Sequence, residues 1–167
     1  DHYSEWGFCL GKTNEWDKSI ARLLTARELS PTAVDNTNLG WAYYNAAKID
    51  KKNGDEAAAK AKFELARTYL NTAVQQDPKM DAAYLNLGST NNEVGDHEAA
   101  VNALNTAIAL HSGWVIAYNQ LGLGYRGLNK LDLALVALNT AVNLDGNYVP
   151  GLFNLGRTQY SAGKKDD

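Results

Sequence analysis

LNTAV at residues 70–74 returns as LNTAI at 104–108 and again as LNTAV at 138–142, in two steps of 34 residues (104 − 70 and 138 − 104). A second phrase keeps the same period and reads YLNLG at 84–88, YNQLG at 118–122 and LFNLG at 152–156. Repetition with a period of roughly 20–50 residues is typical of proteins that stack identical structural units. Two phrases with one shared period therefore predict a chain built of repeats.

The apolar spacing within each unit predicts helices that pack closely in pairs. Tyr84, Leu87 and Asn91 fall at i, i+3 and i+7, which is one stripe of a helix. Gly88 and Ala107 are small residues at positions where two helices must approach, since a larger side chain there would force the helices apart.

Turn signals separate the predicted helices. Gly95-Asp96 and Asn129-Lys130 predict short turns, because Gly and Asn tolerate left-handed backbone angles. The sequence thus predicts helix pairs near 2–12 and 15–28, 33–50 and 55–76, 81–94 and 97–110, and 115–128 and 131–144, with a single helix near 149–162.

Position by position, the unit resembles the tetratricopeptide repeat, whose period is also about 34 residues. The third unit matches the family pattern at Tyr84, Leu87-Gly88, Asn91, Ala100, Leu104 and Ala107, with Ser112 in place of Pro. The fourth unit has Tyr118, Leu121-Gly122, Tyr125, Ala134, Leu138, Ala141 and Gly146. The degenerate first unit has Tyr3, Trp6-Gly7, Leu10, Ser19, Leu23, Ala26 and Pro31. The resemblance implies an all-α, right-handed superhelical solenoid of antiparallel helix hairpins.

We therefore predict one solenoid over residues 1–167. Its repeats are 1–32 (degenerate), 33–80, 81–114 and 115–148, and a half repeat or capping helix occupies 149–167. Leu152, Phe153 and Leu155 in that last helix should leave apolar surface uncovered, because solenoids normally end in a polar cap. Two interpretations stay open: a fragment of a longer solenoid, or a helix that is itself the cap. The first residue is Asp1 rather than Met, which predicts a trimmed N-terminus.

The second repeat is longer than the others. The spacing from Gly40 to Gly54 is 14 residues, against 7 from Gly88 to Gly95. Each helix has therefore gained about two turns, or roughly 10 Å. We expect Ala46, Ala47 and Ile49 to face Ala57, Ala58 and Ala61. A tolerated insertion is one interpretation, and a projecting finger that contacts a partner is the other.

Composition excludes several classes of function. The net charge is −3 and Lys and Arg do not cluster along the sequence, so nucleic acid is not an expected partner. No apolar run reaches the roughly 20 residues that a membrane-spanning helix needs. No catalytic, metal-binding or phosphate-loop motif is present, so we expect no enzyme activity and no cofactor. The single cysteine, Cys9, leaves the compartment open between cytoplasm and periplasm.

The resemblance places the binding surface on the first helix of each hairpin, which in this family lines a concave groove. Candidate peptide-binding residues on that basis are Asn38, Trp41, Tyr44, Asn45, Asn86, Ser89, Asn119, Gln120, Arg126, Asn154 and Arg157. A carboxylate clamp, which some members use, is not expected. The positions that would form it hold Thr37, Trp41, Asn86, Ile116 and Gln120, where only Asn86 matches.

The residue before each Leu-Gly pair is an amide: Asn38, Asn86, Gln120 or Asn154. An amide both donates and accepts hydrogen bonds, so a column of amides could bind a peptide backbone. The pattern is similar to the asparagine ladder in the repeats of O-linked N-acetylglucosamine transferase. The alternative is that amides simply suit a polar, water-filled groove.

The sequence as a whole predicts a protein-interaction scaffold that holds an extended peptide along its groove. Two alternatives remain. One is a recognition arm of a longer enzyme, and the other is a module that self-assembles through the 149–162 helix or the 46–61 hairpin.

Overall fold

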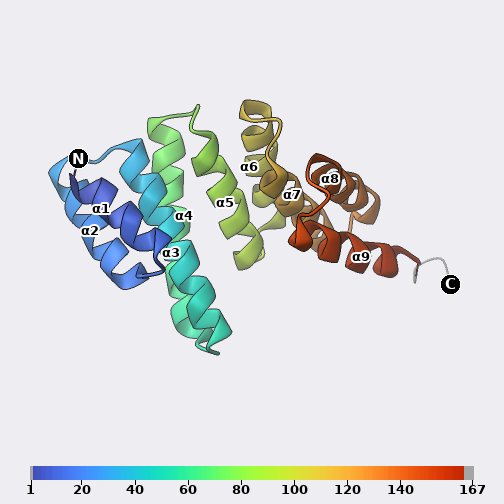
Figure 1. Ribbon diagram of the computed structural model, residues 1–167, viewed down its shortest axis with the longest axis horizontal. Helices are drawn as coiled ribbons and strands as arrows, with labels where there is room; N and C mark the ends of the chain where they lie inside the picture. Colours follow the sequence, from blue (N-terminus) through green and yellow to red (C-terminus); the bar gives the residue numbers. More distant parts are fainter. Residues whose placement is uncertain (1, 164–167) are drawn as a thin grey trace.

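Nine helices make up the computed structural model over residues 2–163, the part of the chain that it describes. They are α1 (His2–Lys12), α2 (Trp16–Leu29), α3 (Ala33–Lys52), α4 (Glu56–Gln76), α5 (Asp81–Val94), α6 (His97–Leu110), α7 (Val115–Gly127), α8 (Leu131–Leu144) and α9 (Val149–Gly163). Successive helices pair into hairpins that follow one another from end to end of the molecule, with the two termini at opposite ends (Figure 1).

Backbone conformation and capping hydrogen bonds define where the helices begin and end. Gly95 and Asn129 have positive φ angles of 85° and 58°, which allow the chain to reverse between α5 and α6 and between α7 and α8. Thr32 and Asp35 form a capping box at the start of α3, in which Thr32 Oγ1 accepts a hydrogen bond from the Asp35 N–H at 3.1 Å. These local signals fix where each helix begins and ends.

Each hairpin is locked by a leucine on its second helix that lies against a glycine on its first helix. A methyl group on any of these glycines would overlap the leucine side chain, so only glycine permits the observed approach. The four leucines are completely buried. The pairs are Gly7 with Leu23, Gly40 with Leu70, Gly88 with Leu104, and Gly122 with Leu138.

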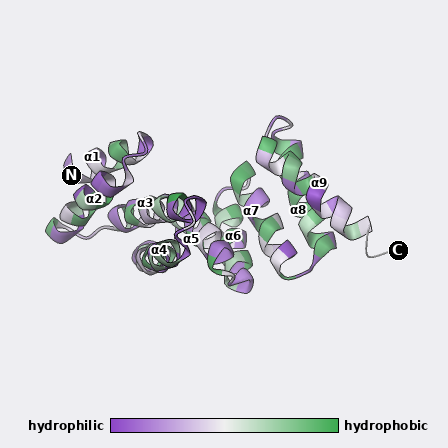
Figure 2. Cartoon of the chain, turned by 90° about the horizontal axis from the view of Figure 1, so that it is seen from below, coloured by the Kyte–Doolittle hydropathy of each residue, from purple (hydrophilic) through white to green (hydrophobic). Residues whose placement is uncertain are grey.

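The first helices, α1, α3, α5, α7 and α9, also contact one another in succession. This arrangement confirms the predicted fold class, an all-α solenoid of antiparallel hairpins. Every helix carries both hydrophobic and hydrophilic residues (Figure 2), as expected where one side of each helix packs and the other faces water. No helix within residues 2–163 combines the length and the apolar character needed to cross a membrane.

The hairpin of α3 and α4 is longer than its neighbours. The two helices have 20 and 21 residues, whereas α5 and α6 have 14 each. Its tip projects beyond the rest of the stack (Figure 1). The expected pairing of Ile49 with the start of α4 is wrong, because Ile49 is 45% exposed. Ala47 forms a buried cluster with Ala59 and Phe63 of α4.

Candidate functional site

A groove of about 610 Å³ opens along the first helices of the second to fifth repeats. Helices α3, α5, α7 and α9 all contribute to its walls, together with the start of α6 and the loop before α9. Its lining residues are Tyr44, Lys48, Asn92, Glu93, His97, Asn119, Gln120, Leu123, Arg126, Gly127, Tyr148, Pro150, Asn154 and Arg157. We refer to this surface as the groove.

Side-chain amides bridge the helices that form the floor of the groove. Asn92 Nδ2 donates to the backbone oxygen of Gln120 at 2.9 Å and to Gln120 Oε1 at 3.3 Å, joining α5 to α7. Asn154 Nδ2 donates to Asn119 Oδ1 at 2.9 Å, joining α7 to α9. Gln120 Nε2 and Asn154 Oδ1 make no hydrogen bond within residues 2–163, so each amide keeps one group for a ligand.

Three cations converge on the groove from three different helices: Lys48, Arg126 and Arg157. None of them forms an ion pair with a carboxylate of the described residues. Lys48 Nζ lies 5.5 Å from the ring centroid of Tyr44. Burial, and secondly the positive charge of Arg157, lowers the pKa of Arg126. The guanidinium nevertheless stays charged at neutral pH, so the groove presents uncompensated positive charge.

The extra length of α3 brings a lysine into the groove. When the second and third repeats are aligned, Ala46 of α3 corresponds to Val94, the last residue of α5. The residues of α3 after Ala46, which include Lys48 and Lys51, therefore form an extension that α5 lacks. Lys51 Nζ forms an ion pair with Glu93 at 2.9 Å and thereby offsets the negative charge that Glu93 brings to the groove. Sequence spacing did not predict this role for Lys48, because no other first helix is long enough to carry an equivalent residue.

Tyr44 lies where the extension meets the groove. Its ring packs against Phe63 of α4, with 5.8 Å between the ring centroids. Burial, followed by the charges of Glu93 and Tyr148, raises the pKa of Tyr44. The phenol therefore remains neutral, and its hydroxyl contributes hydrogen-bonding capacity rather than charge.

The other predicted peptide-binding residues lie outside the groove. Asn38 lines a separate cleft with Ser4, Glu5, Phe8 and Val34, and Asn86 lines neither hollow. Ser89 lies on α5 and is only 6% exposed. Asn45 Nδ2 donates to the backbone oxygen of Trp41 at 2.8 Å. The structure thus brings together Tyr44, Asn119, Gln120, Arg126, Asn154 and Arg157, and of these Asn119 is only 3% exposed.

Trp41 is part of the packing between the first two repeats. Its ring lies 5.3 Å from that of Phe8 and 5.1 Å from that of Trp16, between ring centroids. A methyl group on Gly11 would overlap the indole, so α1 and α3 approach closely at this point. Most of the Trp41 side chain is therefore committed to holding the repeats together.

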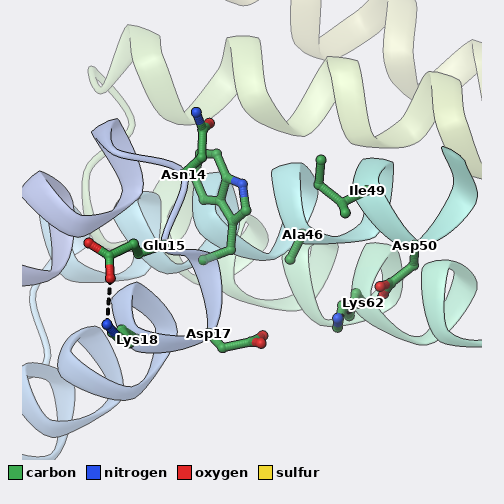
Figure 3. A pocket seen from close by; sticks show the side chains of 9 residues that line it. Asn14, Glu15, Asp17, Lys18, Ala46, Ile49, Asp50 and Lys62 are labelled. Atoms are coloured by element: carbon green, nitrogen blue, oxygen red, sulfur yellow. Dashed lines mark hydrogen bonds and ion pairs between the residues drawn. The ribbon is translucent and has the colours of Figure 1, made fainter. Parts of the chain in front are cut away.

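A second hollow of about 350 Å³ lies under the extension, between the turn that joins α1 to α2 and the far ends of α3 and α4 (Figure 3). Its charges are largely paired within the chain. Lys18 Nζ lies 2.6 Å from a Glu15 carboxylate oxygen, and Lys62 Nζ lies 2.7 Å from Asp50 Oδ2. Because carboxylates neutralise both lysines, this cleft has less free positive charge with which to bind an anionic ligand than the groove has.

Comparison with solved structures gives the same architecture. The crystal structure of MamA has a TM-score of 0.76 at 23% identity, covering 96% of this chain and 86% of that one. TTC0263 from Thermus thermophilus, a thermophilic TPR protein, has a TM-score of 0.77 at 18% identity, covering 95% and 80% of the two chains. The first TPR of Spaghetti (RPAP3), bound to the HSP90 peptide SRMEEVD, has a TM-score of 0.59 at 18% identity, covering 74% and 93%.

No curated protein sequence matches the chain. The family model of the tetratricopeptide repeat matches residues 81–111 and 115–148, which are the third and fourth hairpins. The family model does not match the first two hairpins, but within each of them a glycine of the first helix packs against a leucine of the second in the same way. The fold supports a protein–protein interaction module. The chain therefore contains two tetratricopeptide repeats that match the family model, and residues 2–163 as a whole have the solenoid fold of tetratricopeptide repeat proteins.

Proposed function

We propose that the chain is a protein-interaction scaffold whose groove holds an extended, acidic segment of a partner protein. The observation that carries this proposal is the convergence of Lys48, Arg126 and Arg157 without carboxylate partners among the described residues, in a protein whose net charge is −3. Guanidinium groups bind carboxylates through paired, charge-assisted hydrogen bonds. Anionic side chains on the ligand would therefore neutralise the groove.

The amides of the groove suit the backbone of such a segment. Gln120 and Asn154 each keep a donor or an acceptor beside the cations. An extended peptide presents both kinds of group along its length, at about 3.3 Å per residue. The structure of the first TPR of Spaghetti with SRMEEVD supports the proposal in one respect: this fold can hold a peptide that contains acidic residues.

Fluorescence anisotropy with two labelled peptides would test the proposal. One peptide alternates Glu with Ser and the other alternates Gln with Ser. We expect the Glu peptide to bind about tenfold more tightly, because ~1.4 kcal/mol of charge interaction produces a tenfold change. The double substitution Arg126→Gln with Arg157→Gln should abolish that preference.

The matched control is Lys79→Gln with Lys130→Gln, which removes the same charge from two exposed positions outside the groove. This control should keep most of the preference for the Glu peptide. Equal affinity for the two peptides, or an equal loss in both double variants, would contradict a specific acidic ligand in the groove.

A further inference from the structure

The two arginines of the groove lie on first helices that pack against each other, and each senses the charge of the other. Arg126 lies in the last turn of α7, and Arg157 lies in the middle of α9. The positive charge of Arg157 contributes, after burial, to lowering the pKa of Arg126. Neither guanidinium pairs with a carboxylate of residues 2–163. The two arginines therefore concentrate positive charge on one part of the groove.

Aromatic rings, rather than carboxylates, support two of the three groove cations. Arg157 Cζ lies 5.6 Å from the ring centroid of Phe153, one turn earlier on α9, and Lys48 Nζ lies 5.5 Å from that of Tyr44. A ring face attracts a cation and holds it in place without neutralising its charge. The cations are thus held in position while their charge stays available to a ligand.

A carboxylate and a phosphate group would neutralise this surface to different degrees. A carboxylate brings one negative charge and two oxygens, whereas the phosphate of a phosphoserine or phosphothreonine brings about 1.5–2 charges near pH 7 and three strong acceptor oxygens. Guanidinium groups bind such oxygens through paired, charge-assisted hydrogen bonds. One phosphate offers oxygens to both Arg126 and Arg157, and its charge offsets their mutual repulsion more fully than a single carboxylate does.

Neutral hydrogen-bond donors accompany the cations. Gln120 Oε1 accepts a hydrogen bond from Asn92, which turns Gln120 Nε2 into the donor that the amide keeps for a ligand. Tyr44 and Tyr148 also line the groove, and burial raises the pKa of each, so both hydroxyls stay protonated at neutral pH. A phosphate only accepts hydrogen bonds when it is fully ionised. The groove therefore supplies the donors that such a group requires.

We propose that the groove recognises a phosphorylated serine or threonine on the partner segment, with Arg126 and Arg157 as the phosphate-binding pair and Lys48 as a third cation. This inference rests on the proposed function, because it names the anionic group that the extended segment carries. Nucleic acid fits less well, since it presents a phosphate at every nucleotide and needs an extended basic surface. The chain has a net charge of −3, and the free cations of its groove are confined to three residues.

Three fluorescein-labelled peptides of one length would test the inference. Each alternates Gln with Ser, and the central position holds phosphoserine, Glu or Ser. The chain of residues 1–167 would be titrated into each peptide at constant ionic strength and followed by anisotropy. We expect the phosphoserine peptide to bind about tenfold more tightly than the peptide with the single Glu, because its phosphate adds charge and a third acceptor oxygen.

Single substitutions locate the effect. Arg126→Gln and Arg157→Gln should each reduce the advantage of phosphoserine over Glu to about threefold or less, since each removes half of the phosphate-binding pair. Lys130→Gln is the matched control, because it removes the same charge from an exposed position outside the groove. This control should keep the full advantage, and an equal loss in all three variants would overturn the inference.

The outcomes separate this inference from the proposed function. Equal affinity for the phosphoserine and Glu peptides, both above that of the Ser peptide, would overturn the inference and leave the acidic ligand standing. Equal affinity for all three peptides would contradict the proposed function itself. A single-stranded oligothymidylate that binds as tightly as the phosphoserine peptide would also overturn the inference, because the groove would then bind phosphate without recognising a peptide.

Discussion

The Nζ atom of Lys51, near the end of α3, lies 2.9 Å from a carboxylate oxygen of Glu93 in the last turn of α5. This ion pair ties the extension of the second hairpin to the third repeat. It also offsets the charge of Glu93 at the edge of the groove, so that Lys48 acts there without a neighbouring free carboxylate. The extension is thus part of the groove wall rather than a projection separate from it.

Lys51→Gln should weaken binding of the acidic peptide, because Glu93 would then carry an uncompensated negative charge beside the ligand. The free energy of unfolding should fall by less than ~1 kcal/mol, since a largely exposed ion pair contributes little. Anisotropy and urea denaturation would measure the two effects. Lys52→Gln, the exposed neighbouring position, removes the same charge, and an equal loss of affinity in both variants would rule out a specific role for the Lys51–Glu93 pair.

Gly122→Ala should destabilise the chain by about 1–3 kcal/mol, because its methyl group would overlap Leu138 in a closely packed hairpin. Gly156→Ala, at the matching position of α9, should be neutral or should stabilise by up to about 1 kcal/mol through its helix propensity. Thermal denaturation separates the two, at roughly 2–4 °C per kcal/mol. Equal destabilisation by both substitutions would contradict this expectation, because a methyl group on Gly156 meets nothing within 4 Å.

Asn36→Ala should lower the free energy of unfolding by about 1–3 kcal/mol, because it would leave buried polar groups without partners. The Asn36 side chain is completely buried, donates to Gln76 Oε1 at 2.8 Å and accepts from Arg27 Nε at 3.0 Å. It therefore links α2, α3 and α4. Chemical denaturation should show no comparable loss for Asn105→Ala, which alters an exposed amide on α6.

Stability should decline above about pH 10, the ordinary pKa of a tyrosine. Burial raises the pKa of Tyr44 in the folded chain, so above that pH the unfolded chain loses a proton that the folded chain retains. Each tyrosine whose pKa is raised by folding lowers the free energy of unfolding by about 1.4 kcal/mol per pH unit above about pH 10. Below that pH it has no effect, because the tyrosine is neutral in both the folded and the unfolded chain. Urea denaturation at rising pH should show a shallower decline for Tyr44→Phe than for Tyr160→Phe, an exposed position. Identical slopes would contradict the assignment.

The predicted amide ladder can be tested with the triple substitution of Asn38, Asn86 and Asn154 by alanine. If the ladder binds the peptide backbone, affinity should fall for the Glu peptide and the Gln peptide alike, since backbone contacts do not depend on side-chain charge. The matched control replaces three exposed amides on second helices, Asn71, Asn105 and Asn139. Affinities that do not distinguish the two triple variants would exclude the ladder.

The sequence by itself determined the period, the helical character and the positions, such as Gly88, where paired helices approach closely. Gly88 and the leucine that it contacts, Leu104, lie within one repeat, so the constant spacing marks the position of the close approach, and the structure identifies the contact itself. The positive-φ turns at Gly95 and Asn129 follow from the same local rules. These features are encoded by neighbouring residues, so a single chain without structural data is enough to predict them.

The resemblance predicted Arg126 and Arg157 as groove residues, whereas only the tertiary structure decided that Lys48 lines the same surface. Lys48, Arg126 and Arg157 line one groove because the lengthened α3, which packs against α5, carries Lys48 to it, and no constant spacing relates these three positions. Whether a cation is neutralised likewise depends on which carboxylate lies beside it in space, as Lys51 has Glu93 and Arg126 has none among the described residues. Local periodicity sets each hairpin, whereas the charge of the groove arises from the way the hairpins are stacked.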